Sequence, residues 1–157
     1  MAKVIAKPAV DYGPLAALIG VWEGDKGIDV APEPDGSEEH PYYETMTFEA
    51  GGDLKNAKKQ VLAIVRYLQI VRRKSNHEVF HDQTGYWMWD ASAGVVIQSL
   101  AIPRALCLVA AGRYRGAAKP KGKIELKVSA KLSDPAGALS SRPSCVTTPG
   151  PRSSATP

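Results

Sequence analysis

The chain contains little cysteine and little histidine. Its 157 residues include two cysteines, Cys107 and Cys145, and three histidines. Two cysteines cannot build a disulfide framework, and neither a C-x-x-C nor an H-E-x-x-H motif occurs. We therefore predict no metal site from motifs, and the scarcity of cysteine favours a reducing, cytoplasmic location.

Long apolar runs and enzyme signatures are also missing. The longest apolar stretch, residues 105–111, falls well short of the roughly 20 residues that a membrane helix needs. The first eight residues do not read as a signal peptide, and neither a P-loop nor a G-x-S-x-G motif is present. These absences predict a protein without a membrane partner and without classical catalytic residues.

The charge is mildly positive but dispersed. The formal net charge is +4, and the largest basic cluster is only residues 72–74. A nucleic-acid-binding domain usually concentrates its lysines and arginines into a patch or stripe. We therefore predict that nucleic acid is not a partner.

Strand signals dominate the rest of the chain. Alternation and β-forming residues predict about seven short strands, at residues 21–30, 42–49, 61–71, 77–89, 95–102, 105–114 and 123–132. A helical stub is expected at residues 14–19, and residues 31–37 carry the chemistry of a loop. Gly24 and Gly27 predict a bulge or bend in the first strand, and Gly85 predicts a bulge in the fourth. The predicted class is an all-β, lipocalin/calycin-like, up-and-down antiparallel β-barrel.

The composition divides the chain into two parts. Residues 1–132 form the predicted barrel domain, whereas residues 133–157 are rich in serine, proline and threonine and contain no aromatic residue. Such a composition predicts disorder. A barrel that gains no strand from this tail would stay incomplete, and its exposed strand edges would favour a homodimer.

We hypothesise further that the tail is translated in a shifted reading frame. Allowed codons for residues 136–154 can be read in another frame as W-G-I-V-Q-S-S-I-M-R-D-N-A-R-T-T-E-F. Serine codons of the TCN type become apolar codons in that frame, so a serine-rich tail can conceal an apolar strand. A natural flexible tail is the alternative.

Two ordered motifs suggest a family. Gly20-Val-Trp-Glu-Gly24 follows the short helix, and His81-Asp-Gln-Thr-Gly-Tyr86 lies in the fourth predicted strand. Together they resemble the G-x-W-x-G and H-x-E/Q-S/T-G-Y stretches of nitrobindin-type, fatty-acid-binding-protein-like barrels of bacterial type. The resemblance covers roughly residues 12–132. It implies a ten-stranded barrel around a cavity, and the tail string in the shifted frame resembles the segment that follows the seventh strand in these proteins.

The resemblance also implies a cofactor. Nitrobindins bind haem b in the cavity, and their ferric form has been linked to peroxynitrite isomerisation and nitric oxide binding. Their iron is held by a histidine near the C-terminus. The histidines of this chain are His40, His77 and His81, so that ligand has no counterpart in its C-terminal quarter.

Five residues are candidates for contacting a ligand: Trp22, Arg66, His81, Gln83 and Tyr86. His81 corresponds to a histidine that the family places near the haem, and Gln83 shares its face of the strand if no bulge intervenes. Trp22 could instead anchor the core, and Arg66 could point outward. Tyr86 begins the run to residue 89, in which one pair of side chains should face inward.

These observations predict a binding module for a small hydrophobic ligand, with haem as the guest that the family suggests. A haem-dependent peroxynitrite isomerase is the alternative from the enzyme class. A filled barrel, or an open sheet that pairs with a partner chain, is the third interpretation. A large apolar pocket would argue against the third.

Overall fold

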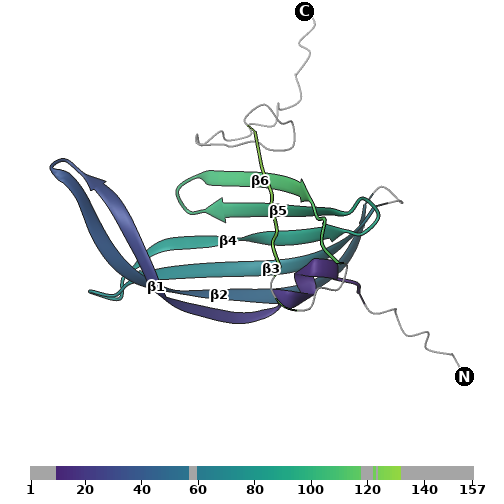
Figure 1. Cartoon of the computed structure of the whole chain (residues 1–157), viewed down its shortest axis with the longest axis horizontal. Coiled ribbons are helices and arrows are strands. Elements are labelled where there is room, and N and C mark those ends of the chain that lie inside the picture. Colours follow the sequence, from purple (N-terminus) through teal and green to yellow (C-terminus); the bar gives the residue numbers. More distant parts are fainter. Residues whose placement is uncertain (1–9, 57–59, 118–121, 123, 132–157) are drawn as a thin grey trace, which may run out of the picture.

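The computed structural model describes residues 10–56, 60–117, 122 and 124–131, which form one antiparallel sheet and a short helix. Each of the six strands is hydrogen-bonded to the next strand in the sequence (Figure 1). Their bounds are β1 Gly20–Glu33, β2 Gly36–Asn56, β3 Gln60–Arg73, β4 Val79–Asp90, β5 Val95–Ile102 and β6 Leu106–Arg113. The predicted all-β, up-and-down antiparallel class is confirmed.

The first hairpin is longer than the sequence predicts. Residues 31–37 were expected to form a loop, but most of them are paired, and a turn at Pro34 and Asp35 joins Glu33 to Gly36. Gly36 has a φ of 144°, which glycine adopts at little steric cost. The turn-forming residues therefore occupy only the tip of a long β1–β2 hairpin.

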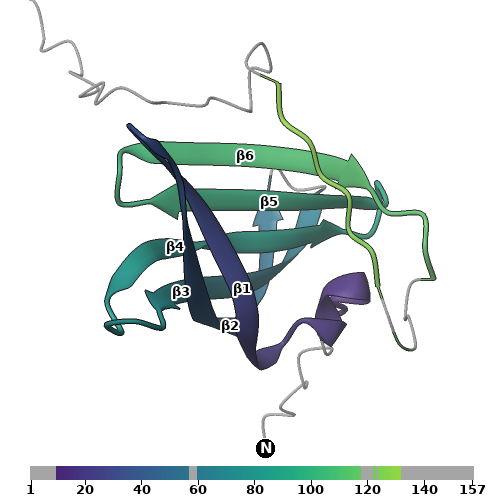
Figure 2. The same ribbon diagram turned by 60° about the vertical axis from the view of Figure 1, so that its left-hand side comes forward.

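Three register shifts bend the described sheet. Strand β1 has an extra residue between Gly24 and Gly27, as these two glycines predicted, and β2 has one between Ala50 and Gly52. Strand β4 has its extra residue at Phe80 and not at Gly85, where the pairing with β3 and β5 is continuous. A bulge bends its strand and increases the local twist. Figure 2 shows the β1–β2 hairpin crossing the other strands at a steep angle. The sheet is therefore curved and has a concave face.

The strand register determines which side chains share that concave face. Trp22 on β1 lies opposite Met46 on β2, Met46 lies opposite Gln69 on β3, and Gln69 lies opposite Gln83 on β4. Because successive side chains point to opposite faces, every second residue along each strand joins this row or a parallel one. Four strands thus contribute to one continuous surface.

The core lies at one end of the concave face, under the 3-10 helix η1 (Gly13–Ala17). Leu15 of η1 is fully buried, and Trp89 is only 7% exposed. The other buried members of the cluster are Phe48, Ala63, Val65, Tyr67 and Val96. Burying a leucine side chain stabilises a fold by about 2 kcal/mol, so η1 is held by packing more than by its own hydrogen bonds.

Two contacts fix the position of η1. Gly13 has a φ of 52°, and a Cβ at this position would collide with the indole ring of Trp89. The bulge in β2 turns the N–H of Gly52 toward the N-terminal segment, where it donates to the Tyr12 hydroxyl over 3.0 Å. The helix is therefore attached to the sheet on both sides of the core.

The predicted seventh strand does not form. Residues 124–131 meet β6 at a single bridge, in which Ala111 and Ser129 exchange two backbone hydrogen bonds of 3.1 Å. Figures 1 and 2 show the segment crossing the open side of the sheet, from near η1 to beyond β6. We refer to residues 124–131 as the cover segment.

The cover segment still buries the apolar side that its alternation predicted. Leu126 and Val128 pack against the core cluster. Its backbone at Lys127 lies so close to Gly112 that a Cβ on this glycine would collide with it. Because Gly112 has no side chain, the segment can approach the face of the sheet there, and packing replaces the expected strand ladder.

The described strands do not close into a barrel, because β1 and β6 are the two edge strands of the sheet. Residues 133–157 lie outside the described residues, so the disordered tail and its shifted frame stay predictions. The pairing of two copies through strand edges also stays a prediction. No helix within the described residues is long and apolar enough to span a membrane.

Candidate ligand pocket

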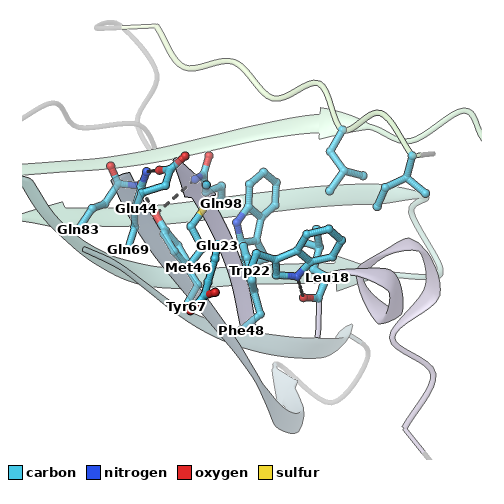
Figure 3. A pocket seen from close by; sticks show the side chains of 14 residues that line it. Leu18, Trp22, Glu23, Glu44, Met46, Phe48, Tyr67, Gln69, Gln83 and Gln98 are labelled. Carbon is cyan, nitrogen blue, oxygen red and sulfur yellow. Dashed lines mark hydrogen bonds between the residues drawn. The ribbon is translucent and has the colours of Figure 1, made fainter. Parts of the chain in front are cut away.

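A pocket of about 620 Å³ lies on the concave face, next to the core (Figure 3). Its floor comes from β1–β5, its side from the residue that follows η1, and its roof from the cover segment. The lining residues are Leu18, Trp22, Glu23, Gly24, Glu44, Met46, Phe48, Tyr67, Gln69, Gln83, Trp87, Gln98, Ile124 and Leu126. The fold therefore leaves part of its apolar face unfilled.

Aromatic rings form much of the wall. Trp22 is 53% exposed, and its indole N–H donates to the backbone oxygen of Leu18 over 2.8 Å. That oxygen comes directly after η1, where helix carbonyls lack internal partners. Phe48 stacks on Tyr67 with their ring centroids 5.9 Å apart. The indole of Trp22 is thus oriented by the end of the helix rather than packed into the core.

Tyr67 is the centre of a polar group in the floor. Its hydroxyl oxygen accepts hydrogen bonds from the side-chain amides of Gln83 (2.7 Å) and Gln98 (3.3 Å). Burial raises the pKa of the Tyr67 phenol, and the two glutamine hydrogen bonds oppose this only in part. The phenol therefore stays protonated at neutral pH, and its own hydrogen remains available to donate to a ligand.

A second polar pair lies beside this group. The amide nitrogen of Gln69 donates to Oε2 of Glu44 over 2.6 Å. Glu44 lies opposite Gly24 in the register, so the directly paired position on β1 carries no side chain. Figure 3 shows Glu44, Gln69 and Gln83 together on one side of the pocket and Trp22 on the other. The pocket thus has a polar side and an aromatic side.

The structure brings together only some of the candidate ligand residues. Trp22 and Gln83 line the pocket. His81 shares the concave face with Gln83, as expected without a bulge, but it lies opposite Val71 and outside the pocket lining. Trp87 and Trp89 are the pair of the aromatic strand that faces inward.

Arg66 and Tyr86 lie on the convex face. They stand opposite each other on β3 and β4, and both are exposed. They border a smaller hollow of about 370 Å³ that also includes Cys107. The outward orientation considered for Arg66 is the one observed, so its guanidinium does not reach the concave pocket.

Sequence reasoning did not select Glu44, Tyr67, Gln69 or Gln98. Each of them carries a local signal, because each is a polar residue in line with apolar ones at alternate positions of a strand. Gln98, for example, interrupts the run Val-Val-Ile-Gln-Ser-Leu of β5. A polar side chain on an apolar face requires a hydrogen-bond partner, but alternation alone does not identify the partner.

Comparison with known proteins gives one match. Residues 11–142 match the protein family described as "THAP4-like, heme-binding beta-barrel domain". The match covers most of the chain and includes every strand and the whole pocket. Searches of curated proteins and of solved structures return no match.

Proposed function

Because the chain belongs to the family of THAP4-like, heme-binding β-barrel domains, we propose that its concave pocket binds a small apolar ligand. One observation carries the proposal: a pocket of about 620 Å³ with aromatic and aliphatic walls and a few hydrogen-bonded polar groups. Ligand sites of soluble proteins commonly have this size and this mixture of side chains. The pocket also argues against a filled barrel.

The aromatic wall of the pocket favours the binding of an apolar ligand. Trp22 leaves about half of its surface exposed, although it faces inward and borders the core. A ligand that covers this indole removes apolar surface from water on both partners, which is the main favourable term in such binding. The hydrogen bond to Leu18 already orients the ring, so little side-chain entropy is lost on binding.

Haem matches the apolar walls better than it matches the polar groups. Protein side chains that hold haem iron include histidine, cysteine, methionine and tyrosinate. Of these types the described lining offers Met46 and Tyr67. Tyr67 is a protonated phenol engaged by two glutamines, and no histidine lines the pocket. The residues present therefore do not fit a histidine-ligated haem.

Titration of the full chain with 1-dodecanol and with haemin tests the proposal. Dodecanol binding is followed by tryptophan fluorescence and haemin binding by the Soret band. Met46→Lys places a charge in the pocket, whereas Thr47→Lys places the same charge on the opposite face of β2. We expect Met46→Lys to weaken binding by about tenfold or more, because a lysine ammonium is poorly solvated there. Thr47→Lys should leave it nearly unchanged.

Two results would contradict this proposal. One is saturable binding that both lysine variants affect equally, which would place the ligand elsewhere. The other is an absence of binding for both ligands while the circular-dichroism spectrum stays that of a β-sheet protein. For haemin, His81→Ala and His77→Ala should give the same Soret band as the parent chain, because neither imidazole lines the pocket.

A further inference from the structure

The charges around the pocket specify the ligand further, on the premise of the proposed function. We propose that the preferred guest is an apolar molecule with a positively charged nitrogen, such as an alkylammonium or arylammonium compound. Of the 14 lining residues, two carry a formal charge, and both are acidic. Glu44 belongs to the concave face, whereas Glu23 alternates with Trp22 along β1 and belongs to the other face. None of the described lining residues is lysine, arginine or histidine.

Glu44 is placed to receive a cation. Its Oε2 atom accepts the hydrogen bond from Gln69, which holds the carboxylate over the floor of the pocket. Its Oε1 atom makes no hydrogen bond with the described residues, and Gly24 across the strand pair leaves space beside it. A carboxylate that is anchored at one oxygen and open at the other can accept a hydrogen bond from an ammonium group.

The aromatic side of the pocket supports the same choice of charge. Trp22, Phe48, Tyr67 and Trp87 all line it, and three of them are the residue types whose ring faces attract cations most strongly. Rings combined with one carboxylate are the chemistry by which proteins recognise ammonium ligands. The neutral Tyr67 phenol adds a ring and a donor without adding negative charge.

Two arginines of β3 point away from the pocket or contact other groups. Arg66 lies on the convex face. Arg73 lies over the ring of Phe80, 5.2 Å from its centroid, and approaches Glu78 at 4.0 Å. A buried carboxylate on a ligand would therefore face Glu44 without a compensating cation, which is unfavourable in a partly desolvated pocket. Fatty acids, and haem through its propionates, carry the wrong charge for this site.

A matched series of twelve-carbon ligands isolates the charge from the apolar chain. Dodecyltrimethylammonium, 1-dodecanol and dodecanoate are titrated separately, below their aggregation concentrations, into the full chain at neutral pH and followed by tryptophan fluorescence. The variants are Glu44→Gln and, as the control, Glu49→Gln, which removes the same charge from the exposed convex side of β2.

We expect the ammonium compound to bind about tenfold more tightly than dodecanoate, with dodecanol between them. Glu44→Gln should reduce this ratio by about fivefold, and Glu49→Gln should leave it within a factor of about two. Thermal unfolding of each variant controls for loss of the fold.

Three outcomes would overturn the inference. The first is that dodecanoate binds as tightly as the ammonium compound. The second is that the ratio of the two affinities is the same in Glu44→Gln as in the parent chain. In either of those cases the charge preference fails while dodecanol binding still upholds the proposed function. If none of the three ligands binds, the proposed function and this inference fail together.

Discussion

The two ends of the concave face are built by the same strands and are used in opposite ways. The covered end, defined by Leu15, Trp89 and Val96, is closed by η1, and its side chains are almost fully buried. The pocket end, defined by Trp22, Glu44 and Gln83, remains open beneath the cover segment. Strand β4 contributes to both ends with residues that lie only a few positions apart.

This difference between the two ends shows why one part of a sheet becomes core while another part forms a ligand pocket. At the covered end the neighbours are apolar and a helix fills the space, so burial contributes directly to stability. At the pocket end the polar side chains of Tyr67, Gln69 and Gln83 are hydrogen-bonded within the floor, so a space can remain above them without leaving these groups unpaired. Stability and binding should therefore respond to different substitutions.

The two tryptophans of β4 allow the largest test of this comparison. Trp89→Ala should lower the free energy of unfolding by about 3–5 kcal/mol, because it leaves a cavity under η1. Trp87→Ala should cost less than about 2 kcal/mol, since its ring borders a space that is already open, but it should weaken ligand binding. Urea unfolding and ligand titration measure the two effects. Equal losses of stability would contradict the division.

Two glycines with positive φ angles test the attachment of η1. Gly13 and Gly94 have φ values of 52° and 64°, but only Gly13 faces a ring, that of Trp89. Gly94→Ala should cost about 1 kcal/mol through backbone strain alone. Gly13→Ala should cost about 2 kcal/mol or more, because strain and collision add. If the two variants unfold at the same urea concentration, the helix is not held against Trp89.

The pH dependence of stability should come partly from the turn that joins β4 to β5. Hydrogen bonds from Ser92, Gln60 and the Ala93 N–H lower the pKa of Asp90. A lowered pKa in the folded state means that this stabilisation is present above the ordinary aspartate pKa and is lost as the pH falls through the folded value. Asp90→Asn should therefore cost about 1–2 kcal/mol at pH 7.

The cost of the same substitution should be smaller at pH 2 than at pH 7, because the carboxyl group of the parent chain gains a proton as the pH falls through its folded pKa. Urea unfolding of both chains at the two pH values measures the difference. A cost that does not change with pH would show that the shape of the side chain matters and its charge does not.

The smallest expected effect on stability belongs to the pocket end. Trp22→Phe removes the hydrogen bond to Leu18 from a half-exposed ring and should change the free energy of unfolding by about 0.5 kcal/mol. It should nevertheless weaken binding of a cationic guest, because indole is the strongest of the aromatic partners. A large loss of stability would instead support the interpretation of Trp22 as a core anchor.

Most of the strand pattern could be predicted from the sequence, because alternation reports which residues share a face. It identified the first six strands, the bulge near Gly24 and the common face of His81 and Gln83. It did not identify the path of residues 124–131, whose alternation is the clearest in the chain. An alternating segment buries one side equally well along a strand edge or across a sheet face, so periodicity cannot distinguish the two arrangements.

The candidate site, like the fold, was predicted from the sequence only in part. The sequence by itself determined the sheet, the alternation by which one pair of residues 86–89 faces inward, and the family resemblance, since these depend on residue type and spacing along the chain. Only the tertiary structure decided that Gln83 and Gln98 meet at Tyr67, that Gln69 holds Glu44 and that Arg66 faces outward. The physical reason is that hydrogen bonds across strands depend on register and curvature, which arise when distant segments pack together.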